Sequence, residues 1–419
     1  MRAVLDLLGA AAAGMFERGP AAVRHTVRST MAVGHVPIWF AGLSSSLVGA
    51  AWANAAAAAA LDVDDGHRLA RGHPGAAVVP TALAVGHETG APWEQILASI
   101  VIGYEVGVTI AAGRLRYGNT GTWASYAVVA TAAALRRTAA PILEHALAIA
   151  GESAPSQAFL SAPAQTPAPE GSDVKEGIPW SVFTGLVALD LAAANHTGPR
   201  NILEDAHNYA LPEPLELGTY SHIQKTYFKL YACCRHIHAP LDALLGLIAH
   251  YRIDHRSIES IEVATYSGAL RLPNKIWPGS LVDVQYSIRY CLALAARSGA
   301  GALLPLTPDA LGRDDVSELA ARVVLALDPE LNARFPQETL ARVAVVADGR
   351  RFASDVTAPR GEHTQPLTWS ELEDKIRTVT RLCCSEQQSD ALIRAVNEAR
   401  AGRGDALDDI LGSQSLAPC

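Results

Sequence analysis

Ala-rich apolar segments fill most of the first 230 residues, and they constrain the fold more than any other feature of this sequence. Many of them carry apolar side chains all round, which is typical of helices that are buried on several sides. Short turns with Gly or Pro separate the segments. We therefore expect a large helical domain, with helices at about 45–61, 75–90, 94–113, 122–137, 140–151 and 179–195.

The N-terminus and residues 40–61 raise the question of export or of a membrane span. The first stretch, MRAVLDLLGAAAAGMF, weakly resembles a signal peptide, but Asp6 interrupts its apolar run. Residues 40–61 carry no charge, yet they are mostly Ala with Ser, Gly and Asn54, which is too weakly hydrophobic for a convincing span. We interpret both stretches as buried helices of a cytoplasmic protein that does not enter a membrane.

The sequence pattern changes after about residue 250, where apolar and polar residues begin to alternate as in strands. The expected strands cover 260–266, 341–347 and 351–357. The last two flank Asp348-Gly349, which is a strong hairpin signal. Helical runs at about 283–297 and 314–321 lie between the strands, so this part of the chain is predicted to be a smaller α+β unit.

Helix signals return near the C-terminus. Thr368 with Glu371 forms one capping box. Ser385 with Gln388 forms another, and Gly402 follows it as a stop. We expect these helices to pack back on the helical domain, which makes the α+β unit an inserted lid and the cleft a natural ligand site. The fold class is mostly α with an α+β insertion: a helical domain (1–230), an α+β lid (231–366) and C-terminal helices (367–419).

Charge and cysteine content narrow the classes of function. The chain has 34 basic and 42 acidic residues, a net charge of −8 and no long charge run, which argues against a nucleic-acid partner. Local basic groups can still bind an anionic substrate. Six cysteines include two adjacent pairs and no C-x-x-C spacing, so neither a secreted disulfide framework nor a zinc site is indicated. We infer a reducing cytosol.

The densest polar cluster lies between two apolar segments, at residues 62–73. It holds three carboxylates, two guanidiniums and two imidazoles, in Asp62, Asp64, Asp65, Arg68, Arg71, His67 and His73. A loop of this kind sits at helix ends, where side chains converge. One interpretation is a solvated interhelical loop. Another is a metal site formed by Asp64, Asp65 and His67.

A second cluster, from Tyr227 to Asp242, joins the helical and α+β parts, where a residue of the cleft is expected. His236 and His238 could be a metal pair. Alternatively, one of them is a general acid or base, and Asp242 orients it. The plain alternative is a helix start capped by a histidine.

Three further ionic residues stand out. Lys175 lies in a Pro/Gly-rich loop at 161–179, near a helix start where the dipole favours a neutral amine. It is either a proton carrier or a surface lysine. Glu105, in an apolar helix, more often holds a hydrogen-bond network than does chemistry, and Arg289 could anchor a substrate carboxylate or pair across the domain boundary. The common nucleotide, esterase and zincin motifs are absent from the sequence.

Six stretches of the chain, taken in order, resemble the MmgE/PrpD family, which includes 2-methylcitrate dehydratase, cis-aconitate decarboxylase and iminodisuccinate epimerase. The stretches are 61–86 (LDVDDGH…GHPGAAVVPTALAVG), 100–107 (IVIGYEVG), 194–204 (ANHTGPRNILE), 225–245 (KTYFKLYACCRHIHAPLDALL), 282–295 (VDVQYSIRYCLALA) and 359–376 (PRGEHTQPLTWSELEDKI). Each stretch alone is a weak match to the family, but the order and spacing of the six are specific to it. The resemblance implies a large helical domain with an inserted α+β lid, a homodimer, and no metal or cofactor.

The resemblance also implies roles for single residues. The candidate catalytic residues are Asp62 (the family's active-site aspartate), His73 (its HPG histidine), Lys175 (its lysine before a helix start) and His238 (its histidine before the I/L-D-A element). The first loop carries one extra residue against one branch of the family. Asp64 or Asp65 could therefore take the place of Asp62.

One stretch departs from the family pattern. Many members carry a further histidine at the start of the helix after GYEVG, where this chain has Gly118 or Asn119. The loss of that imidazole weakens a decarboxylase interpretation and suggests a branch nearer the epimerase. Nearby amide and hydroxyl groups could still hydrogen-bond a carboxylate. The candidate substrate-binding residues are His67, Arg68, Asn119, Thr120 and Arg289.

Reactions in the family share a step that moves a proton, or its CO2 equivalent, on a carbon next to a carboxylate. Such a step needs a base at the carbon and cations or donors at the carboxylate. We expect His238 or Lys175 as the base, the other as the conjugate acid, and a small di- or tricarboxylate as substrate. A dehydratase like 2-methylcitrate dehydratase is the first hypothesis. An epimerase of an amino- or imino-dicarboxylate, a metal enzyme and a non-catalytic helical binding protein are alternatives.

Overall fold

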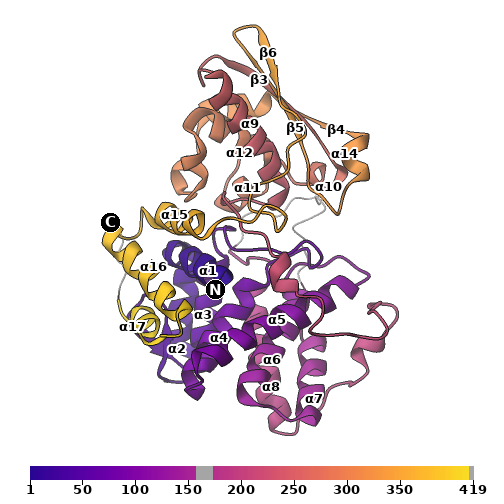
Figure 1. The fold of residues 1–419 in the computed structure, drawn as a ribbon, viewed down its shortest axis with the longest axis vertical. Helices are drawn as coiled ribbons and strands as arrows, with labels where there is room; N and C mark the ends of the chain where they lie inside the picture. Colours follow the sequence, from indigo (N-terminus) through magenta and orange to yellow (C-terminus); the bar gives the residue numbers. More distant parts are fainter. Residues whose placement is uncertain (157–172, 415–419) are drawn as a thin grey trace.

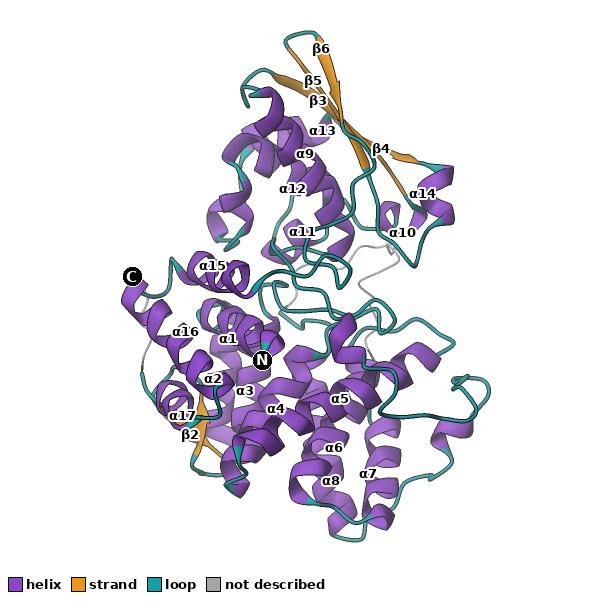
Figure 2. Cartoon of the chain, viewed as in Figure 1, coloured by secondary structure: helices purple, strands orange, loops and turns teal. Residues whose placement is uncertain are grey.

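The computed structural model describes residues 1–156 and 173–414. Figures 1 and 2 show a large helical body and a smaller α+β body, with loops gathered between them. Most of the loop expected at 161–179 therefore lies outside the described residues. The part from residue 173 onward leads directly into α8.

The helical body confirms the helices expected from the Ala-rich segments. The expected six lie close to the predicted positions, and α1 and α2 precede them. The bounds are α1 (Arg2–Gly14), α2 (Arg18–Thr30), α3 (Leu47–Ala59), α4 (Gly75–Thr89), α5 (Trp93–Gly113), α6 (Gly121–Arg136), α7 (Ala140–Glu152) and α8 (Ile178–Ala193). A short antiparallel pair of strands that the sequence did not suggest, β1 (Val36–Ile38) and β2 (Leu43–Ser45), lies between α2 and α3.

One helix, α5, is long and apolar enough to cross a membrane. However, 67% of its apolar window is buried inside the protein, where it packs against α4 and α6. The uncharged stretch at 40–61 likewise forms α3, which is buried along almost its whole length. Both are core helices of the helical body.

The α+β body contains a four-stranded mixed sheet in the order β4-β3-β5-β6. Its strands are β3 (Ile258–Thr265), β4 (Val323–Leu327), β5 (Arg342–Ala347) and β6 (Arg350–Ala353). β3 pairs in parallel with β4 and antiparallel with β5, with Ile261 opposite both Val323 and Val345. The predicted hairpin is confirmed: Asp348 and Gly349 both have positive φ and connect β5 to β6. β4 was not predicted.

Helices pack beside this sheet, with α9 against β5 and α12 against β4 (Figure 1). The helix expected at 283–297 is split in two, and the one expected at 314–321 is α13. The bounds are α9 (His238–Tyr251), α10 (Ser267–Leu270), α11 (Leu281–Gln285), α12 (Ile288–Ser298), α13 (Asp314–Ala321) and α14 (Pro329–Ala333). Short 3-10 turns cover Ile202–Glu204, His222–Lys225, Arg235–Ile237, Ala300–Leu303 and Pro308–Ala310.

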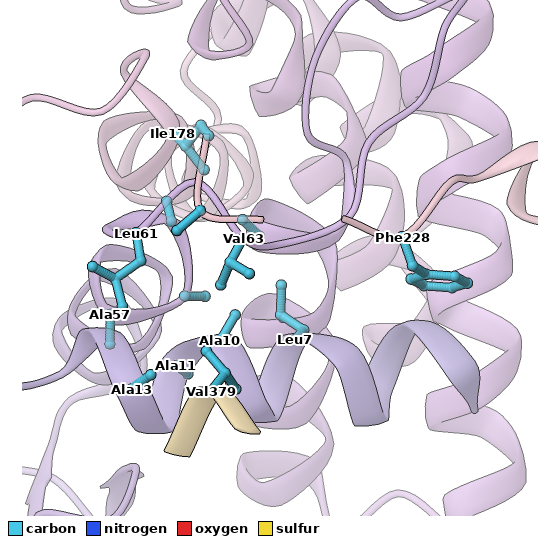
Figure 3. Close-up of a cluster of buried hydrophobic side chains, with 14 of the residues drawn as sticks. Leu7, Ala10, Ala11, Ala13, Ala57, Leu61, Val63, Ile178, Phe228 and Val379 are labelled. Atoms are coloured by element: carbon cyan, nitrogen blue, oxygen red, sulfur yellow. The ribbon is translucent and has the colours of Figure 1, made fainter. Parts of the chain in front are cut away.

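The C-terminal helices α15 (Trp369–Thr380), α16 (Glu386–Arg400) and α17 (Asp405–Gly412) return to the helical body, where α15 packs along α1. Both predicted capping boxes are present, at Thr368 and Ser385. Figure 3 shows Leu7 and Ala10 of α1 beside Val63 of the loop that follows α3, with Val379 of α15 nearby. Helices α1 and α15 thus support the loop that carries Asp62.

A buried ion pair joins these two helices. Asp6 of α1 and Lys375 of α15 are both inaccessible to solvent, and Lys375 Nζ also donates to the Val63 carbonyl at 2.8 Å. Burial raises the pKa of Asp6 to about 6 even with Lys375 beside it. The charge that interrupts the apolar N-terminus therefore has a structural partner.

We expect Lys375→Met to lower the free energy of unfolding by about 3–5 kcal/mol at pH 7.5, because it leaves Asp6 buried without its partner. The loss should be smaller at pH 5, where an unpaired Asp6 takes up a proton and its charge disappears. Urea unfolding at the two pH values measures both effects. Lys225→Met, at an exposed lysine, is the matched control. Equal unfolding midpoints for Lys375→Met and wild type would contradict the interpretation.

Candidate active site

A cavity of about 300 Å³ lies where the helical body meets the linker and the α+β body. Figure 2 shows that loops, more than helix faces, occupy this junction. A wider, mainly apolar hollow of about 730 Å³ adjoins the charged cluster at Lys175. We place the candidate site in the smaller cavity because charged and titratable groups converge there. Its lining includes Asp62, His67, Arg68, Arg71, His73, Tyr117, Glu176, Tyr227, Lys229, Cys234, Arg235, His236, Arg271, Tyr286 and Thr339.

Asp62 is the centre of the charged groups. It follows α3 with a left-handed backbone (φ 55°), which Asp adopts more readily than most residues. Its Oδ1 lies 2.8 Å from Lys175 Nζ and 2.9 Å from Lys229 Nζ. Burial alone would raise the pKa of this carboxyl, but the two ammonium groups lower it, so Asp62 is ionised. Burial acts to lower the pKa of Lys229, but the negative charge of Asp62 raises it.

His73 lies just before α4 and faces Asp62. Its Nδ1 is 3.0 Å from the Asp65 carbonyl oxygen and 3.1 Å from Asp64 Oδ2, and its Nε2 is 3.5 Å from Asp62 Oδ1. Burial and Lys229 act to lower the pKa of His73, but Asp64 outweighs them and raises it. The Asp65 carbonyl accepts from Nδ1, with the Asp64 carboxylate close beside it, so the proton is held at Nδ1 and Nε2 is the basic atom beside Asp62.

Gly75 allows the loop and α4 to come close together. A Cβ atom at this position would lie 2.5 Å from Asp65 Oδ1 and 2.7 Å from the Tyr104 hydroxyl. Instead, the Gly75 N–H donates to Asp65 Oδ1 at 3.0 Å, and Tyr104 donates to the other carboxylate oxygen. Gly75, two residues after His73, therefore has a packing role that positions the loop.

A hydrogen-bond network joins Lys175 to the start of α6. Lys175 Nζ donates to the Tyr286 hydroxyl at 2.8 Å, and that hydroxyl donates to Glu176 Oε1 at 3.1 Å. The other oxygen of Glu176 accepts from Thr120 Oγ1 at 2.7 Å. Burial would raise the pKa of Glu176, but His73 and Lys175 lower it. The carboxylate thus sits at the positive end of α6, where a negative charge is favoured.

Cationic side chains outnumber carboxylates in the cavity lining. Arg68 and Arg235 share Glu362, with one 2.7 Å contact each. Arg71 and Arg271 line the cavity and are exposed. Among the residues that the structure describes, these four guanidiniums and Lys229 are balanced by three carboxylates, Asp62 and Glu176 of the lining and Glu362 beside it. This local excess of positive charge, in a chain of net charge −8, favours an anionic ligand.

Comparison with protein-family models accounts for nearly the whole chain. The MmgE/PrpD N-terminal domain matches residues 1–210, and the MmgE/PrpD C-terminal domain matches residues 231–399. The chain belongs to the MmgE/PrpD family. No curated protein matches it. Membership confirms the resemblance and the predicted fold class, a mostly helical N-terminal region and a C-terminal region with a mixed sheet and helices. The family consists largely of enzymes and implies a small-molecule substrate.

Within this MmgE/PrpD fold, three of the four candidate catalytic residues lie together. Asp62 and His73 line the cavity and contact each other, and Lys175, which lines the wider hollow instead, contacts Asp62. The extra residue in the first loop does not move Asp62 away from them, since Asp64 approaches His73 from its other side. Of the candidate binding residues, Arg68 and His67 line the cavity. Thr120 does not line it, but it hydrogen-bonds Glu176, which does.

The fourth candidate, His238, lies behind the cavity and is not part of its lining. It is the first residue of α9, where its Nδ1 is 3.2 Å from Arg235 Nη1 and its Nε2 is 3.2 Å from the Cys233 carbonyl oxygen. Burial, followed by the nearby cations, lowers the pKa of His238 well below its ordinary value. The structure therefore places His238 against Arg235, outside the cavity lining.

Three other residues singled out by the sequence also lie off the cavity lining. Asn119 is buried beside Thr120, and Arg289 lies on α12. Glu105 accepts three backbone N–H groups, from Gly218, Tyr220 and His222, at 2.9–3.1 Å. It anchors the loop after α8, in line with the hydrogen-bonding role considered for it.

The donor set proposed for a metal does not converge. Asp65 turns toward Tyr104, and His67 packs edge-on against His222 with ring centroids 5.3 Å apart. Burial lowers the pKa of His67 to about 3, so this ring is neutral. A different set, Asp62, Asp64 and His73, has ligand atoms within 4.8 Å of one another. Because Lys175 and Lys229 already hold Asp62, their ammonium groups would repel a cation there.

Sequence reasoning missed several residues of the site. Lys229 lies in a motif quoted for the family resemblance. A lysine inside the apolar run YFKLYACC is a sequence feature that could identify it as a buried functional residue. Glu176 is next to Lys175 in the chain. Tyr286 and Glu362 carry no comparable signal, because only the tertiary fold brings them to the loop after α3.

Proposed function

We propose that this MmgE/PrpD family member is a lyase that acts on a small di- or tricarboxylic acid, as a dehydratase does on 2-methylcitrate. The observation that carries the proposal is the cluster of Asp62, Lys175, Lys229 and His73 at a cavity with excess positive charge. It combines a basic nitrogen with cations able to stabilise the carboxylate of a carbon acid. We also propose a cytoplasmic homodimer that needs no metal or organic cofactor.

In this mechanism, His73 Nε2 removes the proton next to a substrate carboxylate and then gives it to the hydroxyl group on the neighbouring carbon, so that the C–O bond breaks and water leaves as the double bond forms. The Asp65 carbonyl accepts the Nδ1–H hydrogen bond and orients the ring for that transfer, and the nearby Asp64 carboxylate favours the positive charge that the ring gains. The negative charge that develops on the substrate is stabilised by Lys229 and by the cavity arginines, of which Arg71 and Arg271 are the exposed ones. Asp62 keeps the two lysines in place. The base therefore differs from the one expected from sequence, where His238 or Lys175 took that role.

A second candidate is an epimerase of an amino- or imino-dicarboxylate, and Cys234 favours it. An epimerase returns a proton to the opposite face of the carbon, so it needs a second proton carrier. Cys234 lines the cavity from the linker into the α+β body, whereas His73 comes from the helical body. Burial raises the pKa of the Cys234 thiol to about 12, which keeps its proton on sulfur.

Proton NMR in D2O tests the proposal. The purified full-length protein is incubated with 2-methylcitrate, citrate, cis-aconitate and iminodisuccinate, with heat-inactivated protein as the control. A dehydratase gives the signals of an unsaturated acid, while an epimerase gives deuterium wash-in at one carbon without loss of water. Folded protein that neither exchanges nor converts any of the four compounds would contradict carbon-acid chemistry on this class of substrate.

A further inference from the structure

The α+β wall of the cavity carries His236, which the proposed mechanism does not use. It lies in the 3-10 turn before α9 and lines the cavity. Its Nδ1 is 2.6 Å from the Tyr266 hydroxyl. Tyr266 is buried and stacks on Phe335, with ring centroids 4.5 Å apart and planes 12° from parallel. The imidazole is therefore held by a phenol that packing keeps in one orientation.

The groups around the Tyr266 phenol indicate which partner donates in this contact. Burial raises the pKa of Tyr266 well above its ordinary value, so the phenol retains its proton. Thr339, which accepts from Arg68 at 3.1 Å, also hydrogen-bonds the phenol. The Tyr266 O–H then donates to Nδ1 of His236, which leaves the imidazole proton on Nε2.

The charge of this imidazole follows from its surroundings. Burial, followed by the positive charge of Arg68, lowers the pKa of His236 to about 4. The ring is therefore neutral at pH 7. Among residues 1–156 and 173–414, the side chain of His236 hydrogen-bonds through Nδ1 and not through Nε2. A neutral ring with Nδ1 occupied and Nε2–H available is a donor for a ligand oxygen.

We propose that His236 is a catalytic residue of the α+β wall: its Nε2–H donates a hydrogen bond to the substrate oxygen on which negative charge develops. Tyr266 is its positioning residue, because it fixes the tautomer. The proton stays on Nε2 throughout, so no covalent or redox step is involved. The assignment rests on the proposed carbon-acid chemistry for its role, but the tautomer is a property of the protein without substrate.

The tautomer is tested first, by nitrogen-15 NMR of full-length protein labelled at histidine. The His236→Gln spectrum identifies the resonances of His236 among those of the 14 histidines. We expect a neutral ring protonated at Nε2 that does not titrate between pH 8 and pH 5, and a mixture of tautomers in Tyr266→Phe. A proton on Nδ1, or a titration near pH 6.5, would overturn the assignment whether or not the D2O panel shows turnover.

Kinetics test the catalytic role. With the substrate that the D2O panel selects, we expect His236→Ala to lower kcat about 10²-fold with little change in KM, the size seen when one preorganised donor is removed. His236→Gln, which keeps an N–H donor, should recover part of the loss, and Tyr266→Phe should cost about 10-fold. His250→Ala, at an exposed histidine of α9, is the control. Unchanged kcat in folded His236→Ala would exclude the role.

Discussion

Replacing His73 by Asn is expected to lower kcat by about 10²–10⁴-fold, the range that a general base contributes. Asn can still donate a hydrogen bond toward the Asp65 carbonyl, which His73 Nδ1 approaches at 3.0 Å. It has no basic nitrogen to take the place of Nε2 beside Asp62. Steady-state kinetics on the substrate selected by the D2O panel measure the loss, and circular dichroism with a thermal midpoint checks that the variant is folded.

The pH dependence gives an independent test of the same residue. A base must be neutral to act, so kcat/KM should fall as the pH decreases and His73 becomes protonated. Because Asp64 raises the pKa of His73, the inflection should lie above the ordinary value of about 6.5. Asp64→Asn removes that charge and should move the inflection to lower pH. An unmoved inflection, or wild-type kcat in folded His73→Asn, would exclude His73 as the base.

The elements that sequence predicted well are those with a local cause. The Ala-rich runs, the two capping boxes and the Asp348-Gly349 turn each specify their own backbone, and the structure contains them. β4 escaped prediction because its five residues, VVLAL, do not alternate and follow α13 directly. Its exposed edge position and parallel pairing with β3 depend on the fold of the whole α+β body.

The site shows a similar limit. His236 and His238 are two residues apart, and their sequence does not determine which one reaches the cavity. The 3-10 turn at Arg235–Ile237 decides it, because His236 lines the cavity while His238 begins α9 behind Arg235. Asp62 could be identified from its motif, but its two partners come from positions 175 and 229. Only long-range packing shows that both lysines contact one carboxylate.

Those two contacts make Asp62 the residue whose loss should affect both stability and activity. Asp62→Asn leaves Lys175 and Lys229 close together and buried, and it removes the carboxylate that both of them contact. Removing one partner of a buried ion pair typically costs about 3–5 kcal/mol, and here the two remaining cations also repel each other. We expect a loss of that size in the free energy of unfolding at pH 7, measured by urea denaturation, together with loss of turnover.

The pH dependence and a matched surface pair separate this explanation from a general effect of losing a charge. The pKa of Asp62 is lowered in the folded protein, so its stabilisation is present above the unfolded value of about 3.9 and is lost as the pH falls below it. The difference between wild type and variant should therefore narrow in acid. Asp173→Asn breaks an exposed pair with Arg18 and should cost less than about 1 kcal/mol. The double variant Asp62→Asn/Lys229→Met removes one of the two ammonium groups, so it should recover part of the free energy of unfolding that Asp62→Asn loses. If it recovers none, repulsion between the ammonium groups is not the cause of that loss.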